Sequence, residues 1–375
     1  MTTRVSQRQR RFHRRLAQWW AYLANDTVAY VFKRILQALV TLWLASALSF
    51  FIIQLAPGNY LNTLQQNPQI SQEYLADLAQ RFGLAEEPLS PLEVTSWSAF
   101  WAAWMPWLQW VTQSYGRWLV QVVTRLDFGE SFVYSRSVAS LIRERLSATL
   151  MLAMLSIVVT WAIALPLGVI SAVRQNQPAD RLLRAISYIG QGFPSFVTAL
   201  LLLFVAQNLS PLLPVGGLTS INHPNFSLPG KVLDILWHLL LPTIALSMTS
   251  FAGLQRIVRG SMLDVLRQDY IQTARAKGLP ENRVIYVHAL RNAVNPLITI
   301  LGFEFASLLS GSFIAEYFFN LPGLGRLILQ AVQAQDIYLV MASLMMGATM
   351  LIAGNLLADL LLKVVDPRIQ LSRAN

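Results

Sequence analysis

Six uncharged or nearly uncharged runs of membrane-spanning length occupy much of the chain and restrict what it can fold into. A helix needs about 20 apolar residues to cross a bilayer, and backbone polar groups inside lipid must be satisfied within the segment. Only 13% of the residues are charged. The sequence therefore predicts an all-α polytopic membrane protein with six transmembrane helices. The runs are 35–56, 150–173, 186–209, 236–254, 293–315 and 337–362.

The distribution of basic residues predicts the orientation of these runs in the lipid bilayer. Lys and Arg collect in cytoplasmic loops. With the N-terminus inside, residues 1–34, 174–185, 255–292 and 363–375 are cytoplasmic and hold 21 of the 29 Lys and Arg. We therefore expect a cytoplasmic N-terminal arm (1–34) and a cytoplasmic C-terminal tail (363–375). The net charge of +10 is explained by this topology, and no nucleic-acid partner is expected.

A long outer segment, residues 57–149, separates the first run (35–56) from a five-helix core at 150–362. Within it, residues 94–116 carry no charge, and five Trp recur there at helical spacing on one broad face. Trp favours the boundary between membrane and water. We expect an interfacial helix on the outer leaflet; a re-entrant hairpin and an aromatic ligand platform are the alternatives. The five are Trp97, Trp101, Trp104, Trp107 and Trp110.

Motifs for catalysis and cofactor binding are missing from the sequence. The chain has no Cys and four widely spaced His, which argues against disulfides, thiolate metal sites and a His-based metal site. It also lacks a G-x-x-x-x-G-K-[ST] phosphate loop, H-E-x-x-H and G-x-S-x-G. We expect no catalytic residues, no metal and no cofactor in this chain, so that any ATP would be bound elsewhere.

The cytoplasmic loop 255–292 contains a polar, basic segment with a break at its centre. "LDVLRQDYIQTARAK" is a plausible helix, Gly278 suits a left-handed helix cap, and Pro280 suits the first turn of a second helix. Val284, Val287 and Leu290, with Ile285 beside them, would form the apolar face of that helix. Physical reasoning leaves two interpretations open, which are a solvated basic loop and a docking knob.

The same segment resembles the cytoplasmic coupling loop, or "EAA" loop, of ABC importer permeases. Residues 272–274 stand for E-A-A, Gly278 is the glycine of the motif, and residues 288–291 stand for I-x-L-P. "DYIQTARAKGL" and "HALRNAVNP" are similar to the variant in the dipeptide/oligopeptide/nickel branch, specifically its B-type permease. Collinear matches are "LAPGN", "DFGES", "GFPSF", "AEYFFNLPGLGRL" and "DPRI". The longer Arg-rich N-terminus and the Trp-rich outer segment depart from the family pattern.

The resemblance implies a transport subunit of a bacterial plasma membrane, and not an enzyme. The expected partners are a second homologous permease in a heterodimer, two cytoplasmic ATPase subunits that bind ATP and Mg, and an extracytoplasmic solute-binding protein. The solute would be a peptide, a nickel chelate or glutathione. The alternative is an ATP-independent secondary transporter or channel; a membrane enzyme is the third. The expected ATPase-coupling residues are Thr273, Ala274, Ala276, Lys277, Gly278, Leu279, Leu290 and Arg291.

Glu304 is an ionisable residue inside the fifth run, where a charge is costly and is a functional hypothesis by default. It would line the translocation path, or it would be an interhelical hydrogen-bonding carboxyl. Asp359 and Glu316 are interpreted as boundary residues, and His238 as an interfacial residue.

Overall fold

The computed structural model describes residues 2–56, 58, 60–65, 69–82, 88, 90–209 and 213–365, with only the backbone for 2–27, 63, 209, 299, 305–311 and 362–365. The motif "DPRI", parts of "LAPGN" and most of the predicted tail lie outside this part of the chain. All regular elements within it are helical. In chain order they are α1 (Thr2–Leu55), α2 (Tyr60–Gln65), α3 (Gln72–Arg81), η1 (Pro91–Glu93), α4 (Trp97–Arg125), α5 (Val138–Val173), α6 (Pro178–Gly192), α7 (Ser195–Leu209), η2 (His223–Asn225), α8 (Leu228–Leu266), α9 (Asp269–Ala276), α10 (Glu281–Arg283), η3 (Val284–Ala289), α11 (Leu290–Ala293), α12 (Asn295–Phe318), α13 (Leu324–Gln333) and α14 (Ile337–Val365).

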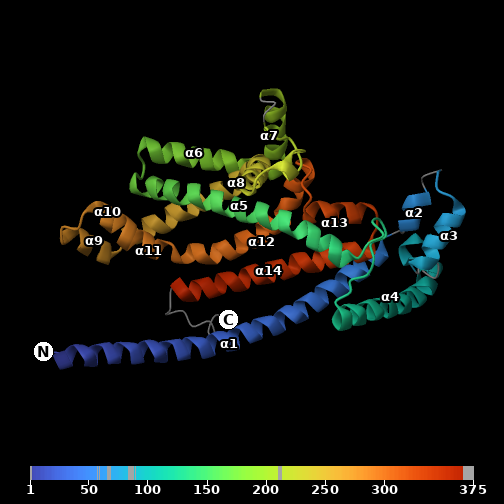
Figure 1. Cartoon of the computed structure of the whole chain (residues 1–375), viewed down its shortest axis with the longest axis horizontal. Helices are drawn as coiled ribbons and strands as arrows, with labels where there is room; N and C mark the ends of the chain where they lie inside the picture. Colours follow the sequence, from blue (N-terminus) through green and yellow to red (C-terminus); the bar gives the residue numbers. More distant parts are fainter. Residues whose placement is uncertain are drawn as a thin grey trace.

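The long helices run side by side, and the short elements gather at the two ends of the bundle (Figure 1). The start of α1, the turn between α5 and α6, and α9 to α11 lie at one end. The other end carries α2, α3, α4 and α13. The described parts of the segments that the sequence predicted to be cytoplasmic therefore lie at one end of the bundle.

Four helices are long and apolar enough to cross a membrane as single helices. They are Val28–Leu55, Val138–Val173, Leu228–Leu266 and Ile337–Leu361. Two bent helix pairs satisfy the same criteria, which gives four to six spans in the described residues.

The third run corrects the expectation of one continuous span at 186–209. It falls on α6 and α7, which are bent by 99° at the break between them. Pro194 lies at this break, and a proline lacks a backbone N–H and disfavours helical geometry in the preceding residue. "GFPSF" therefore marks a sharp turn and not a kink within one helix.

Small residues allow the central helices to approach closely, as is common between membrane helices. On α5, a Cβ at Gly168 would lie 2.6 Å from Val258 on α8. On α12, a Cβ at Gly302 would collide with Ala358 on α14. These contacts join α5 to α8 and α12 to α14, and both pairs pack along one another.

The outer segment folds as a small helical unit around the end of α1. Trp107 on α4 is 1% exposed, and its ring packs on Phe51 of α1 at a centroid distance of 5.1 Å. Trp97 is 75% exposed. The Trp face predicted for the membrane boundary is therefore divided, because its middle packs on α1 while its start stays exposed. The location of α4 on the outer leaflet stays a prediction.

Candidate coupling site

The short helical elements α9, α10, η3 and α11 lie at one end of the bundle and form what we call the coupling segment, residues 269–293. Its first helix, α9, ends in a Schellman motif, in which a left-handed residue directs two N–H groups back to the last carbonyls. Gly278 has a φ of +73°. Its N–H donates to the Arg275 carbonyl at 2.9 Å, and the Leu279 N–H donates to the Ala274 carbonyl at 3.3 Å. The predicted left-handed cap at Gly278 is confirmed.

An ion pair spans the break between the two halves of the coupling segment. Arg275 Nη2 lies 2.7 Å from Glu281 Oε1, and both side chains are partly exposed. Exposed pairs of this kind contribute about 0–1 kcal/mol. The ion pair therefore adds little stability to the coupling segment. The Schellman motif at Gly278 fixes the geometry of the turn between its two halves.

The second half of the coupling segment differs from the regular helix that the sequence predicted. Residues Val284–Ala289 form a π-helix, a wider turn that often occurs at functional sites. Val284, Ile285 and Ala289 are buried, whereas Val287 is 54% exposed. The predicted face of Val284, Val287 and Leu290 is therefore wrong at Val287, because the wider turn changes which residues face the core.

The coupling segment packs on α5 and α8 through one hydrophobic cluster. Ile271 of α9 and Val284 of η3 are fully buried in it. Val258 and Met262 of α8 are also fully buried there, and Ala172 of α5 is 2% exposed. Fully burying an aliphatic side chain contributes about 1.5–3 kcal/mol, so the coupling segment is anchored to the bundle.

A buried ion pair fixes the same end of the bundle. Arg259 of α8 donates from Nε and Nη2 to the two Asp180 carboxylate oxygens at 2.7 and 2.9 Å. Ser171 Oγ also donates to Asp180 at 2.5 Å, and the Asp180 side chain is fully buried. This bidentate contact joins the start of α6 to α8. Sequence reasoning missed it because the partners are 79 residues apart.

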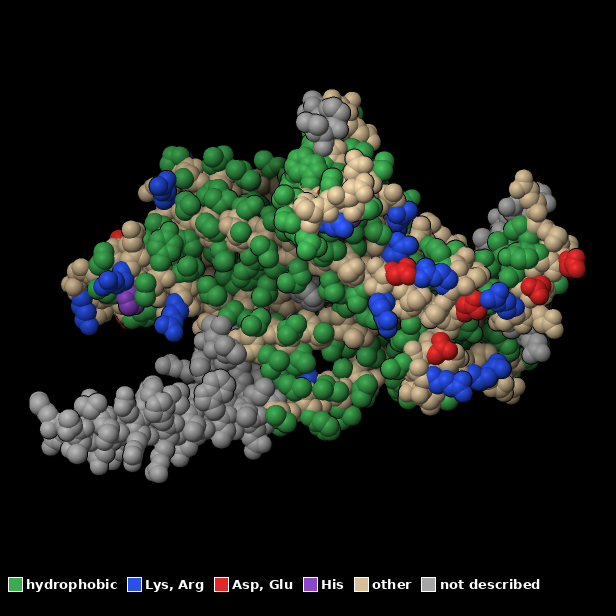
Figure 2. All heavy atoms as spheres, viewed as in Figure 1, with side chains coloured by type: hydrophobic (Ala, Val, Ile, Leu, Met, Phe, Trp, Pro, Cys, Tyr) green, Lys and Arg blue, Asp and Glu red, His purple; other side chains and the backbone are tan. Residues whose placement is uncertain are grey.

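The structure brings the predicted coupling residues together but divides them into two groups. Thr273, Ala276, Lys277, Gly278 and Arg291 are exposed. Basic side chains are prominent among the charged ones at this end in Figure 2.

The other three predicted residues face the bundle to different extents. Ala274 is 8% exposed, and Leu279 and Leu290 are half-buried against the same cluster. Ala274 therefore packs against the bundle, and its role in ATPase coupling stays a prediction. Tyr270 and Tyr286 are about half exposed, at 46% and 56%, and were not predicted.

Glu304 lies among α5, α8 and α12. Trp161 Nε1–H donates to Glu304 Oε2 at 2.7 Å, and the Ser250 side chain is also hydrogen-bonded to it. This is the interhelical arrangement that the sequence left open; a role in the path stays a prediction. The structure shows no group of three or more possible metal ligands in the part of the chain that it describes.

Glu316 is a boundary residue by position, at the end of α12, but it is 1% exposed. It accepts hydrogen bonds from Thr149 Oγ1 at 2.7 Å and from the Arg326 N–H at 3.1 Å. A Cβ at Gly323 would collide with its carboxylate. Glu316 thus holds "NLPGLG" against the bundle. The apolar residues that surround Glu316 in the sequence gave no sign of this role.

Asp359 and His238 also have partners within the chain. Asp359 accepts from Arg34 Nη2 at 3.0 Å and from Tyr30 Oη at 2.5 Å, which ties α14 to α1. His238 Nδ1 lies 2.8 Å from the Asp234 carbonyl oxygen. The first contact links two helices, whereas the second lies within the first turns of α8.

Comparisons with known proteins give the family of a chain with this architecture. Residues 164–371 match the family described as "Binding-protein-dependent transport system inner membrane component". The oligopeptide transport system permease protein AppB of Bacillus subtilis is 37% identical over 91% of this chain and 99% of its own. The dipeptide transport system permease protein DppB of Escherichia coli K12 is 31% identical over 91% and 98%. A solved structure of the MetNI methionine ABC transporter in inward facing conformations aligns with a TM-score of 0.46 at 17% identity, over 60% of this chain and 97% of that one. The chain belongs to the family of inner membrane components of binding-protein-dependent transport systems.

Proposed function

We propose that this chain is the transmembrane permease subunit of an ABC importer for peptides or a related small solute, such as a nickel chelate or glutathione. The observation that carries the proposal is the match to permeases of oligopeptide and dipeptide transport systems along almost their whole length. The Schellman-capped coupling segment supports it, because a fixed, exposed knob at one end of the bundle suits contact with an ATPase subunit.

In this proposal the coupling segment docks on a cytoplasmic ATPase subunit through its exposed residues. ATP and Mg would bind to two such subunits, and movement between their open and closed states would switch the bundle between outward and inward access. The ATPases can shift this equilibrium only if their contacts differ in free energy between the two states. Gly278 is the central contact, because its surface is open and its backbone conformation is fixed.

The proposed topology places the coupling segment and both termini in the cytoplasm of a plasma membrane. The excess of Lys and Arg in these segments supports that orientation, and Figure 1 shows α9, α10 and the start of α1 at the same end. A second homologous permease would complete the pathway in a heterodimer, and a solute-binding protein would dock at the end that carries α2 to α4.

A direct test is co-purification followed by reconstituted transport. The chain, expressed with the other subunits encoded beside it, should purify with an ATPase subunit. In proteoliposomes with the binding protein, it should take up a labelled dipeptide only with ATP. Ion-driven uptake without an ATPase would instead identify a secondary transporter or channel and would refute the proposal.

We also propose that Glu304 contributes to the translocation path by attracting a peptide amine or a cation. Glu304→Gln keeps an acceptor oxygen for Trp161 but removes the charge. Uptake should then fall for cationic peptides more than for acidic ones at unchanged expression. Equal uptake of both would leave Glu304 with its interhelical role alone.

A further inference from the structure

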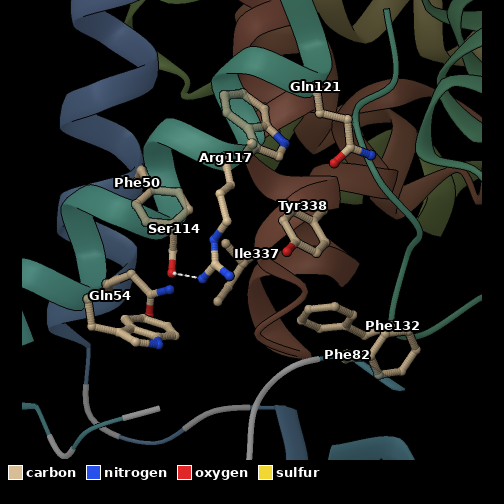
Figure 3. Close-up of a pocket in the computed structure, with 11 residues that line it drawn as sticks. Phe50, Gln54, Phe82, Ser114, Arg117, Gln121, Phe132, Ile337 and Tyr338 are labelled. Carbon is tan, nitrogen blue, oxygen red and sulfur yellow. Dashed lines mark hydrogen bonds between the residues drawn. The ribbon is translucent and has the colours of Figure 1, made fainter. Parts of the chain in front are cut away.

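A cavity of about 300 Å³ lies in the outer unit between α1, α4 and α14, and Phe82 and Phe132 from the connecting segments complete its wall. Its walls are largely aromatic and include Phe50, Trp110, Trp118 and Tyr338. Figure 3 shows that Arg117 of α4 projects between Gln54 of α1 and Tyr338 of α14. The cavity therefore combines aromatic walls with one positive charge.

The polar groups of this cavity have unused hydrogen-bonding capacity. Arg117 donates to Ser114 Oγ at 3.2 Å, and no described carboxylate forms an ion pair with it. Gln54 is 7% exposed, and its side-chain amide lines the cavity without a hydrogen-bond partner among the described residues. A largely buried amide is more stable when it has a hydrogen-bond partner. Both groups point to a ligand with an anion and further hydrogen-bonding atoms.

An apolar cavity of about 240 Å³ adjoins the first one and shares Gln54 and Ile337 with it. Its other walls include Ile52, Ile53 and Val340. Ile52 is 57% exposed on α1, near the end of the candidate span Val28–Leu55. A polar, cationic site and an apolar site thus meet at the outer end of a spanning helix.

We propose that these two cavities bind one anionic phospholipid of the outer leaflet, with its phosphodiester group at Arg117 and the start of an acyl chain beside Ile52 and Val340. Arg binds phosphate through several N–H groups at once, and Trp and Tyr favour this depth of the bilayer. The hydroxyl groups of a phosphatidylglycerol headgroup would pair with the Gln54 amide.

The lining favours this lipid over a transported peptide and over a free anion. A free peptide carries an ammonium group, and no Asp or Glu among the described residues lines either cavity to accept it. Inorganic phosphate would leave the apolar cavity uncovered. Glu304, proposed above for the translocation path, lines neither cavity.

The test is native mass spectrometry of the detergent-purified transporter complex, titrated with phosphatidylglycerol or with phosphatidylcholine of the same acyl chains. The complex should retain phosphatidylglycerol preferentially. Arg117→Gln should weaken this binding about tenfold, as expected when a charge-assisted hydrogen bond is lost, and Arg117→Lys should restore part of it. Arg125→Gln removes an exposed charge from the last turn of the same helix and should have no effect.

Three outcomes would overturn the lipid assignment. They are equal retention of both lipids, unchanged binding in Arg117→Gln, and displacement of the lipid by millimolar inorganic phosphate, glycerol 3-phosphate or dipeptide. Because the readout is lipid retention, the result does not depend on which solute the permease carries.

Discussion

Substitution of Gly278 tests the proposed coupling role, because the structure separates its effect on the fold from its effect on docking. Gly278 has a φ of +73°, and a Cβ built on it meets no atom within 4 Å. The cost of Gly278→Ala within the chain is therefore backbone strain alone, about 1–2 kcal/mol for a side chain in the left-handed region. Asn tolerates this region better, so Gly278→Asn should unfold nearly as the parent does.

Docking should respond much more strongly than folding to the same changes. Gly278→Asp adds bulk and negative charge to an exposed basic surface and should abolish ATP-driven uptake while membrane insertion stays intact. Gly278→Pro should do the same, because Pro fixes φ near −65° and removes the hydrogen bond to the Arg275 carbonyl. Gly260→Ala is the matched control, since its Cβ also meets no atom within 4 Å but it lies within regular helix α8.

Two measurements on the purified complex distinguish these effects, which are thermal unfolding and dipeptide uptake in proteoliposomes. If uptake requires Gly278 only for its left-handed helix cap, Gly278→Asn should transport normally and Gly278→Ala should lose uptake in proportion to its lost stability. If close approach of the ATPase matters, both should lose uptake beyond their change in stability. Normal uptake by Gly278→Asp would refute the coupling role of this residue.

Three further predictions concern the bundle. Gly302→Ala should destabilise the complex by about 1–3 kcal/mol through overpacking, and adding Ala358→Gly should restore its stability in a thermal-unfolding assay. If the double variant stays destabilised, the contact between positions 302 and 358 is not the cause. Arg259→Met should lower the free energy of unfolding by about 3–5 kcal/mol, because it leaves the buried Asp180 unpaired. The double variant Arg259→Met, Asp180→Leu should recover much of this loss. Equal stability of the single and double variants would contradict that reasoning. Burial raises the pKa of Asp336, so the folded state holds this proton more tightly than the unfolded state does. Stability should therefore fall as pH rises from the ordinary Asp range through the raised pKa, and Asp336→Asn should lack this component of the unfolding profile; identical pH slopes would refute it.

Hydrophobic length predicted the helical fold and the approximate positions of most spanning helices, because crossing a bilayer imposes both. It could not predict how far the helices extend. Helix α5 begins at Val138, twelve residues before the uncharged run at Leu150, because charged residues are favourable in a helix once it leaves the lipid. The 99° bend at Pro194 was also hidden, since a proline alone does not specify a bend angle.

The candidate site could be predicted wherever the chemistry is local. A left-handed cap at Gly278 follows from the residue itself and its sequence neighbours. The π-helix at Val284–Ala289 has no comparable local signal, and it changed the buried face. Asp180 and Arg259 meet only after α6 folds back beside α8, so their pairing depends on tertiary structure.

Under the proposed coupling mechanism, the packing of the coupling segment decides which helices would move with it. Ile271 and Val284 are both fully buried in one cluster with α5 and α8. Moving the segment alone would expose both side chains, at about 1.5–3 kcal/mol each. The Asp180–Arg259 pair adds a second link from α8 to the start of α6. A force applied at Gly278 therefore meets less resistance if α5, α6 and α8 move with the coupling segment as one body. Under this proposal, the bend before α7 and the break between α11 and α12 would be the hinges between this body and the rest of the bundle.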